Sequence, residues 1–303
     1  MKRLHRIFLA GTLLLGAAAA PARAELKVLA CEAEWAALAT AIGGDAVDAS
    51  SATTGKQDPH RIEARPSLIA KVRNADLLVC TGLDLEAGWL PVLLQQSGNR
   101  AIQPGQPGHF LAGTLVKRLD LPSSLDRSQG DLHGGGNPHI QLDPHNIATV
   151  AKALAARLAE LDGAHAADYN TRLAAFLERW NAAIVRWEAS AAPLRGATVV
   201  THHRDMVYLT QWLGMRELGT LEPKPGLEPT SGHLAELVTQ LAQEHARMVL
   251  RTPYQAERAS SWLADRVSIP AVMIPNTVGG SEEATDLFSL FDDIIARLTR
   301  ALA

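Results

Sequence analysis

Three of the eleven histidines stand where metal ligands could stand. His60, His139 and His203 each fall in a loop at or just past the end of an expected strand, with neighbours that restrict the backbone. In open α/β sheets the ligand site lies beyond the carboxyl ends of the strands, so such side chains point into a cleft. Three neutral imidazoles meeting there would bind Zn²⁺ and leave one position open. The alternative is three unrelated loop histidines, since they lie tens of residues apart.

Most of the other histidines have a simpler explanation. His5 belongs to an N-terminal leader, and His165, His233 and His245 lie among polar residues of expected helices. We expect those three side chains to be solvated at the surface.

The element expected to hold the three loops in place is one long helix over residues 162–192. Its apolar residues recur at three- and four-residue steps, which indicates a helix with one buried face. They are Tyr169, Leu173, Phe176, Leu177, Trp180, Ile184, Trp187 and Ala191. Asp162 is the expected N-cap, and Pro193 with Gly196 ends the pattern. We predict a rigid rod that joins two lobes.

Strands and helices alternate on both sides of this helix. In residues 25–161 we expect strands at 26–30, 46–52 and 77–80, a short one at 115–119, and helices at 34–42, 66–72, 85–94 and 145–161. In residues 193–303 we expect strands at 197–201, 247–250 and 271–274, and helices at 205–213, 230–245, 255–266 and 286–302. This alternation predicts an α/β fold of two lobes with parallel sheets, joined by the helix, with the metal site in the cleft between them. The lobes share element order but no sequence repeat.

Residues 1–24 have the features of a secretory signal peptide. Basic residues precede an apolar run from Ile7 to Ala20, and Ala22-Arg23-Ala24 is a small-x-small cleavage site. The run is too short for a membrane anchor, and no cysteine follows it to carry a lipid. We expect export and cleavage before Glu25, which places the mature protein in the periplasm.

The charge of the chain argues against two classes of partner. The formal net charge is -3, and removal of the four basic residues of the leader takes it to about -7. An acidic surface disfavours nucleic acid and anionic membranes but is compatible with a cationic ligand. We therefore expect no nucleic-acid partner.

The only two cysteines, Cys31 and Cys80, each stand near the end of an expected strand. An even pair in an oxidising compartment suggests one disulfide. Adjacent strands often hold side chains at the wrong angle for a bridge, so two buried thiols remain the alternative.

Five segments together resemble one known family. They are Asp58-Pro-His60, Pro66-Ser67 through Ala75-Asp76-Leu-Leu-Val with Gly82 and Glu86, Asn137-Pro-His139 with Leu142-Asp-Pro144, Val199-Val-Thr-His-His203 with Tyr208-Leu209, and Glu222-Pro-Lys-Pro-Gly-Leu-Glu-Pro229. In this order they resemble the metal-binding subunits of bacterial ABC importers that have a rigid helical backbone, including zinc- and manganese-capture proteins. The resemblance covers nearly all of the mature chain.

The resemblance implies a ligand set. The family's first three ligands fall on His60, His139 and His203, with Tyr208-Leu209 setting the register, so that His202 occupies a usually aromatic position. Manganese-type members tend to have a carboxylate at the third position. An imidazole there favours Zn²⁺ over Mn²⁺, because nitrogen is the softer ligand.

The fourth position departs from the family. An Asp is usual just past the last strand, whereas this chain has the neutral Asn276. Asn276 itself, a water molecule, or an acid among Glu282, Glu283 and Asp286 could fill the position. The sequence does not decide among them.

Zinc-type members often carry a long loop rich in His and Asp before the second ligand. Here Asp126, Asp131, His133 and His109 are what remains of it. The loop is either a secondary metal-collecting site or a plain connection.

The function that the resemblance implies is capture of Zn²⁺ outside the cytoplasm and delivery to the permease of an ABC importer, by a monomer without enzymatic activity. A zinc chaperone or adhesin on the same fold is the first alternative. A zinc hydrolase is the second, since three histidines and an open position are also a catalytic arrangement. The chain has no HExxH motif.

Overall fold

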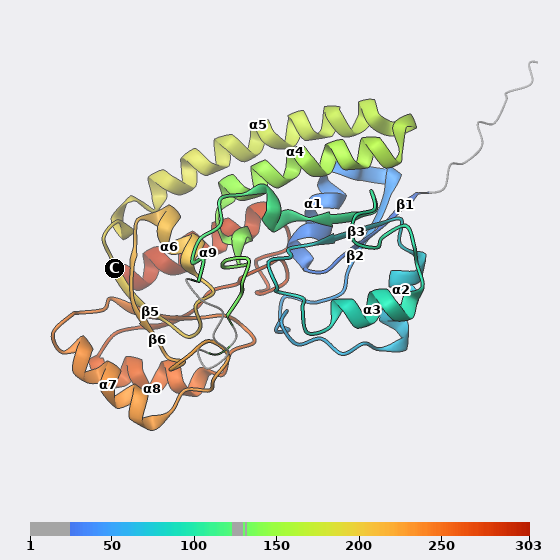
Figure 1. Cartoon of the computed structure of the whole chain (residues 1–303). Helices are drawn as coiled ribbons and strands as arrows, with labels where there is room; N and C mark the ends of the chain where they lie inside the picture. Colours follow the sequence, from blue (N-terminus) through green and yellow to red (C-terminus); the bar gives the residue numbers. More distant parts are fainter. Residues whose placement is uncertain (1–24, 123–129, 131) are drawn as a thin grey trace, which may run out of the picture.

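The computed structural model describes residues 25–122, 130 and 132–303. They form two lobes, each built on a four-stranded parallel sheet (Figure 1). The first sheet has the order β2-β1-β3-β4 and the second the order β6-β5-β7-β8. The two sheets therefore repeat one topology, in which the second strand of each lobe lies at an edge beside the first.

Up to residue 111, the described part of the first lobe contains four strands and three α-helices. They are β1 (Leu26–Ala30), α1 (Ala33–Gly43), β2 (Val47–Ser51), α2 (Pro66–Asn74), β3 (Leu77–Cys80), α3 (Leu90–Ser97) and β4 (His109–Leu111). Strand residues alternate between the faces of the sheet: Val28 and Val79 belong to the core beside α1, whereas Leu29 and Leu78 belong to the core beside α2 and α3. Helices thus cover both faces, as a parallel sheet requires.

The second lobe follows the same plan. It contains β5 (Thr198–Thr201), α6 (Val207–Leu213), β6 (Arg216–Thr220), α7 (Ser231–Leu241), β7 (Met248–Arg251), α8 (Glu257–Val267) and β8 (Ala271–Met273). Its outer core lies beneath α7 and α8 and includes Val200, Val249 and Leu263.

Three helices brace the lobes rather than one. The long helix α5 (Ala166–Ser190) runs from the first lobe to the second, α4 (Pro144–Leu161) lies along it, and α9 (Leu287–Leu302) packs against its second half (Figure 1). The indole Nε1 of Trp180 donates to the carbonyl of Pro144 at 2.8 Å, and that of Trp187 donates to Asp292 of α9 at 2.6 Å. The first of these bonds is buried and the second partly buried, and together they connect α5 to both neighbouring helices.

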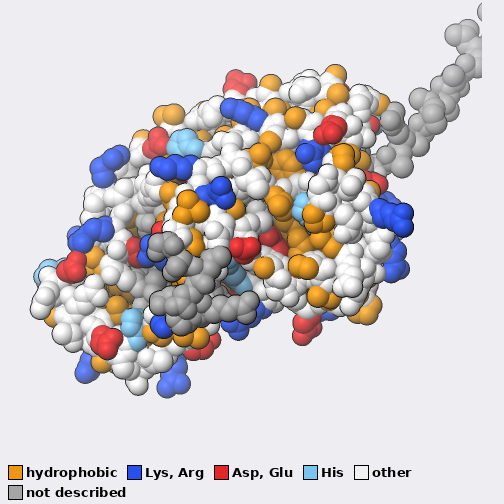
Figure 2. Space-filling view, in the orientation of Figure 1, with side chains coloured by type: hydrophobic (Ala, Val, Ile, Leu, Met, Phe, Trp, Pro, Cys, Tyr) orange, Lys and Arg blue, Asp and Glu red, His pale blue; other side chains and the backbone are white. Residues whose placement is uncertain are grey.

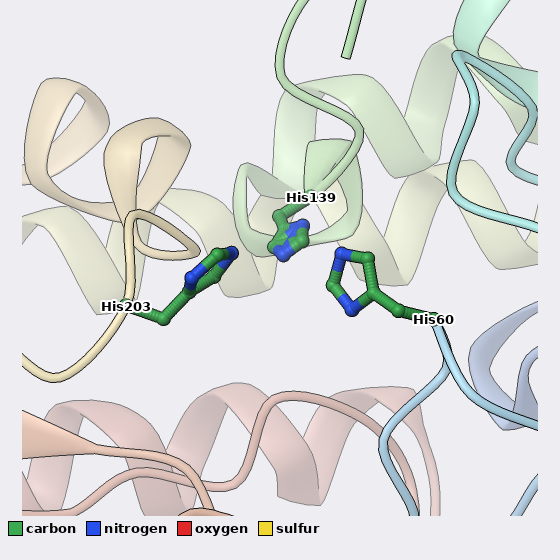
Figure 3. A group of neighbouring side chains, drawn as sticks. All are labelled: His60, His139 and His203. Atoms are coloured by element: carbon green, nitrogen blue, oxygen red, sulfur yellow. The ribbon is translucent and has the colours of Figure 1, made fainter. Parts of the chain in front are cut away.

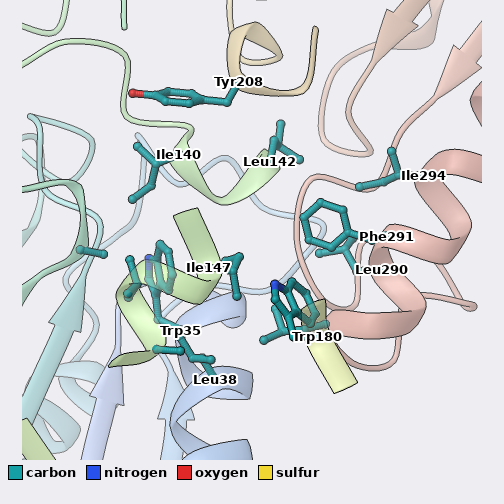
Figure 4. Close-up of a cluster of buried hydrophobic side chains, with 14 of the residues drawn as sticks. Trp35, Leu38, Ile140, Leu142, Ile147, Trp180, Tyr208, Leu290, Phe291 and Ile294 are labelled. Carbon is teal, nitrogen blue, oxygen red and sulfur yellow. The ribbon is translucent and has the colours of Figure 1, made fainter. Parts of the chain in front are cut away.

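One apolar core continues from lobe to lobe. Trp35 and Leu38 of α1, Trp180 of α5 and Phe291 of α9 belong to the same cluster (Figure 4). The ring centroids of Trp180 and Phe291 lie 5.5 Å apart in an edge-to-face arrangement. Because the contact between the lobes is hydrophobic and buried, we expect them to move little relative to one another.

The predicted fold class is confirmed, but several boundaries were wrong. The α-helical part of the long helix begins at Ala166, because Gly163–His165 forms a 3-10 helix at its start. Asp162 is the N-cap of that 3-10 helix, as predicted, and also the C-cap of α4. The helix expected over 85–94 begins only at Leu90. Residues 115–119 form no strand; the fourth strand is the three-residue β4 instead, and the half-exposed edge strand β6 was not predicted.

The two cysteines form a disulfide. Cys31 follows β1 and Cys80 ends β3, and their Cα atoms lie 4.8 Å apart across the paired strands. Both side chains are buried. The bridge ties together the two central strands at the end of the sheet that faces the cleft.

Across the parts of the chain that are described, no helix is both long and apolar enough to cross a membrane. On the face shown in Figure 2, basic and acidic side chains are interspersed rather than gathered into patches of one sign.

Candidate metal centre

His60, His139 and His203 meet in the cleft between the lobes (Figure 3). Their ring centroids are 5.4 Å (His60 to His139), 5.6 Å (His60 to His203) and 5.8 Å (His139 to His203) apart. One ring nitrogen of each lies within 4.8 Å of the others. The structure therefore brings together the three side chains that the sequence singled out.

His60 sits in the loop after β2, and that loop is held from two sides. Its backbone N–H and its Nδ1 both bond to Oδ1 of Asp58, at 3.0 Å and 2.7 Å. The carbonyl of Pro59 accepts from the indole of Trp89 at 2.8 Å. With Nδ1 engaged, Nε2 is the nitrogen left for a ligand.

His139 begins the 3-10 turn that leads into α4. Its N–H donates to Oδ1 of Asn137 at 3.1 Å, and the amide of Asn137 donates to the carbonyl of Arg204 at 2.7 Å. The hydroxyl of Tyr208 donates to the carbonyl of Asn137 at 3.1 Å. The turn is thus fastened to the second lobe at the residues that follow His203.

His203 lies in the loop after β5, and the neighbouring strand β6 positions its partner. Beyond the ladder, the N–H of Glu222 still donates to the carbonyl of His202 at 3.1 Å. Oε2 of Glu222 accepts from Nδ1 of His203 at 2.6 Å. This pair was not predicted, because Glu222 is 19 residues away from His203 and follows a strand that was not predicted.

Two of the three histidines, His60 and His203, are therefore each hydrogen-bonded to a carboxylate. Asp58 and Glu222 fix the tautomer of His60 and His203 and make each Nε2 a better electron donor. Both acids stand in segments quoted above for the family resemblance, but no role was assigned to them. Together they place two carboxylates next to the three imidazoles.

Burial and neighbouring charges set the protonation of the triad. Burial, followed by the nearby rings of His60, His203 and His133, holds the pKa of His139 well below its ordinary value. Burial alone would also lower the pKa of His203, but the hydrogen bond to Glu222 and the nearby acids outweigh it and raise the pKa. The imidazole of His139 is consequently neutral at pH 7, whereas His203 holds a proton more readily.

The acids proposed as alternatives for the fourth position have other partners. Glu283 pairs with Arg297 at 3.1 Å, Asp286 caps the N-terminus of α9, and Glu282 lines a separate cavity. Asn276 is closer to the centre. It lines a small cavity that His139 also borders, and its buried Oδ1 has no hydrogen-bond partner among the described residues.

A fourth histidine reaches the triad. Nε2 of His133 lies 3.3 Å from Nε2 of His60, and its ring centroid is 6.4 Å from that of His139. The sequence placed His133 in a loop of uncertain role. Asp126 and Asp131 of the same loop lie outside the described residues.

Beside the triad, a cavity of 210 Å³ opens between the lobes. Asp58, His60 and Arg61 line it from the first lobe, and His202, Glu222 and Glu228 from the second. His202 is next to His203 in sequence but is not part of the triad.

The fold and the site define a class of protein: the solute-binding proteins of metal importers, with two α/β lobes braced by a long helix and a histidine centre between them. The family described as ZnuA, zinc-uptake complex component A, periplasmic, matches residues 28–301. The chain belongs to this family.

Relatives with curated names point to more than one metal. A zinc-binding lipoprotein AdcA of Streptococcus pneumoniae is 23% identical over 253 residues, which are 81% of this chain and 48% of that protein. An iron ABC transporter substrate-binding lipoprotein, MtsA of Streptococcus pyogenes, is 31% identical over 150 residues, 46% of this chain and 48% of that one. The chain spans about half the length of the curated relatives that it matches.

Solved structures share the fold. A crystal structure of ZnuA superimposes with a TM-score of 0.76 at 21% identity, covering 92% of this chain and all of the other. A laminin-binding adhesin (Lmb) of Streptococcus agalactiae gives the same score at 18% identity over the same shares.

Proposed function

We propose that the chain captures Zn²⁺ outside the cytoplasm and delivers it to the permease of an ABC importer. The observation that carries this proposal is the triad itself: three imidazoles with a ring nitrogen of each within 4.8 Å of the others, two of them hydrogen-bonded to carboxylates. Zinc bound by neutral histidines with acids behind them is a common arrangement in zinc sites.

The donor atoms favour zinc over manganese. All three proposed ligands are imidazole nitrogens, whereas Mn²⁺ prefers carboxylate and carbonyl oxygens. Relatives are named for zinc, manganese and iron, so their names do not identify the metal. Our choice of zinc therefore rests on the three imidazole nitrogens of this chain.

For the fourth position we propose His133, ahead of Asn276 or water. Two nitrogens bound to one tetrahedral Zn²⁺ at 2.0–2.1 Å lie about 3.3 Å apart. The Nε2 atoms of His60 and His133 lie 3.3 Å apart. His133→Ala should then weaken zinc binding by about ten-fold, while His202→Ala should change it far less.

We also propose how the chain is divided and where the protein acts. Residues 1–24 would be a cleaved signal peptide, and residues 25–161, 162–192 and 193–303 the first lobe, linker and second lobe of a periplasmic monomer. The cavity of 210 Å³ would be the route of the ion to the triad. The acids Asp58, Glu222 and Glu228 along it suit a cationic ligand.

The deciding experiment is native mass spectrometry with metal analysis on the protein from Glu25 onward, followed by competition titrations with Zn²⁺ and Mn²⁺. We expect one tightly bound Zn²⁺ and a much weaker Mn²⁺. Equal affinities for the two ions would reject the zinc assignment.

The alternative of a zinc hydrolase is tested in parallel. We propose that the centre is not catalytic, since the family is described as a zinc-uptake component and MtsA is named a substrate-binding lipoprotein of an ABC transporter. Zinc-dependent turnover of generic ester or peptide substrates, lost in His139→Ala, would overturn that part of the proposal.

A further inference from the structure

A second and much smaller cavity lies against His139. Its walls come from both lobes and include Glu32, Glu34 and Gln141 together with Asn276 and Thr277. Of the zinc triad, only His139 borders it. Its volume of about 10 Å³ is enough for a single water molecule or a single ion.

This cavity is lined by acceptors that lack donors. Oδ1 of Asn276 and Oε1 of Gln141 are buried and have no hydrogen-bond partner within the described part of the chain. The two side chains are 7% and 6% exposed. The amide of Gln141 is oriented, because its Nε2 donates to the carbonyl of Asn276 at 3.1 Å, which leaves Oε1 as the atom without a partner.

A buried carboxylate completes the set. Glu34 is 1% exposed, and its Oε2 accepts from the hydroxyl of Thr277 at 2.5 Å. No Lys or Arg among the described residues borders the cavity. Burial raises the pKa of Glu34 to about 7, in spite of the Thr277 hydrogen bond. In its charged form, the Glu34 carboxylate has no cationic side chain opposite it in the described lining of the cavity.

Buried polar groups in native proteins are nearly always satisfied, so several acceptors around one small space point to an occupant that only donates or is positively charged. A carboxylate and two amide oxygens are ligands that hard divalent cations prefer.

We propose that this cavity is a second cation site, in which Glu34, Gln141 and Asn276 bind a small hard divalent ion such as Mn²⁺. It differs from the zinc triad in its donor atoms and shares only the neighbourhood of His139. The second site depends on the proposed zinc-binding function only because His139 lies next to both sites. Two dications this close repel each other, so zinc in the triad should weaken binding of the hard ion.

The test uses Mn²⁺ alone on the metal-free protein, followed by electron paramagnetic resonance, in which bound Mn²⁺ loses the six-line signal of the free ion. Zn²⁺ affinity is measured separately by chelator competition. The variants are Glu34→Gln, His203→Ala and, as a charge-matched surface control, Glu236→Gln, whose side chain is 81% exposed.

We expect Glu34→Gln and His203→Ala each to weaken the binding of one ion and not of the other. Glu34→Gln should weaken Mn²⁺ binding by about ten-fold or more and leave Zn²⁺ affinity nearly unchanged, since one carboxylate ligand is lost from the oxygen site alone. His203→Ala should do the reverse. Glu236→Gln should change neither.

Three outcomes would overturn the second site: no Mn²⁺ binding to the parent protein, parallel losses of both ions in both variants, or Mn²⁺ binding that Glu34→Gln leaves unchanged. If Glu34→Gln does not fold, Asn276→Asp replaces it. The added carboxylate should tighten Mn²⁺ about ten-fold, and a flat result would equally reject the site. Failure of zinc binding in the parent protein would instead reject the proposed function.

Discussion

The tripeptide Asp-Pro-His occurs twice, at Asp58-Pro59-His60 and at Asp143-Pro144-His145, and the two copies differ only in where the fold puts them. In both, the first Asp accepts from the N–H of the histidine, at 3.0 Å and 2.9 Å, and from its Nδ1, at 2.7 Å and 2.9 Å. In both, the proline carbonyl accepts from a tryptophan indole at 2.8 Å.

The surroundings of the two histidines are different. The side chain of His60 is 17% exposed and its Nε2 faces His133 in the cleft. The side chain of His145 is 55% exposed, and its Nε2 lies 3.6 Å from Glu188 of α5. The same local hydrogen bonds thus orient a proposed metal ligand in one place and, in the other, a histidine at a helix cap that lies beside a surface carboxylate. An imidazole whose Nδ1 is held by an aspartate becomes a candidate ligand only where other imidazoles lie close to it.

The largest expected difference in zinc affinity is between variants of His60 and of His145. His60→Ala should lower zinc affinity by about 1,000-fold or more, because it removes one imidazole of the triad, whereas His145→Ala should leave it unchanged. His139→Ala and His203→Ala should resemble His60→Ala. Chelator competition with purified, metal-free variants measures the contrast, and an equal loss in His145→Ala would contradict the assignment of the site.

The second contrast is between the two aspartates. Asp58→Asn keeps the size of the side chain but removes the charge behind His60, and loss of such an outer partner typically costs 10–100-fold in metal affinity. Asp143→Asn is the matched control and should leave zinc binding unchanged. If Asp58→Asn binds zinc like the parent protein, the carboxylate–histidine pair does not contribute to the centre.

Acid should weaken zinc binding through His203. Its pKa is raised above the ordinary 6.5, so as pH falls a proton competes with the metal there first, at a higher pH than for an ordinary histidine. Affinity should fall about ten-fold per pH unit for each proton that zinc must displace. Glu222→Gln removes the partner that raises this pKa and should move the loss to lower pH.

Titrations from pH 8 to pH 5.5 measure that shift, and Glu188→Gln, beside His145, is the control. A profile that does not move in Glu222→Gln would show that His203 does not limit binding.

The smallest effect concerns stability. Asp143 is the N-cap of α4, so Asp143→Ala should lower the free energy of unfolding by ~1 kcal/mol without changing zinc affinity. Urea denaturation of the metal-free protein measures the difference. A loss of zinc binding in this variant would mean that the cap also positions His139, which precedes it by four residues.

Sequence reasoning succeeded where the signal is local and periodic. The strand at Leu77–Cys80 and the α/β alternation came from short apolar runs and repeating spacings. It failed at β4 and β6, which are short edge strands with partly exposed residues and have no strong pattern of their own. The second failure hid Glu222, whose position depends on β6.

By itself, the sequence determined the class of fold, the loops that carry His60, His139 and His203, and the Asp-Pro-His turns that orient Nδ1. All of these depend on residues a few positions apart, whose steric and hydrogen-bonding preferences act locally. Only the tertiary structure decided that His133 lies beside His60, that Glu222 supports His203, and that Glu34 and Asn276 line one cavity from opposite lobes. Those contacts join residues 19 to more than 200 positions apart, and the packing of two lobes against one shared core is what brings them together.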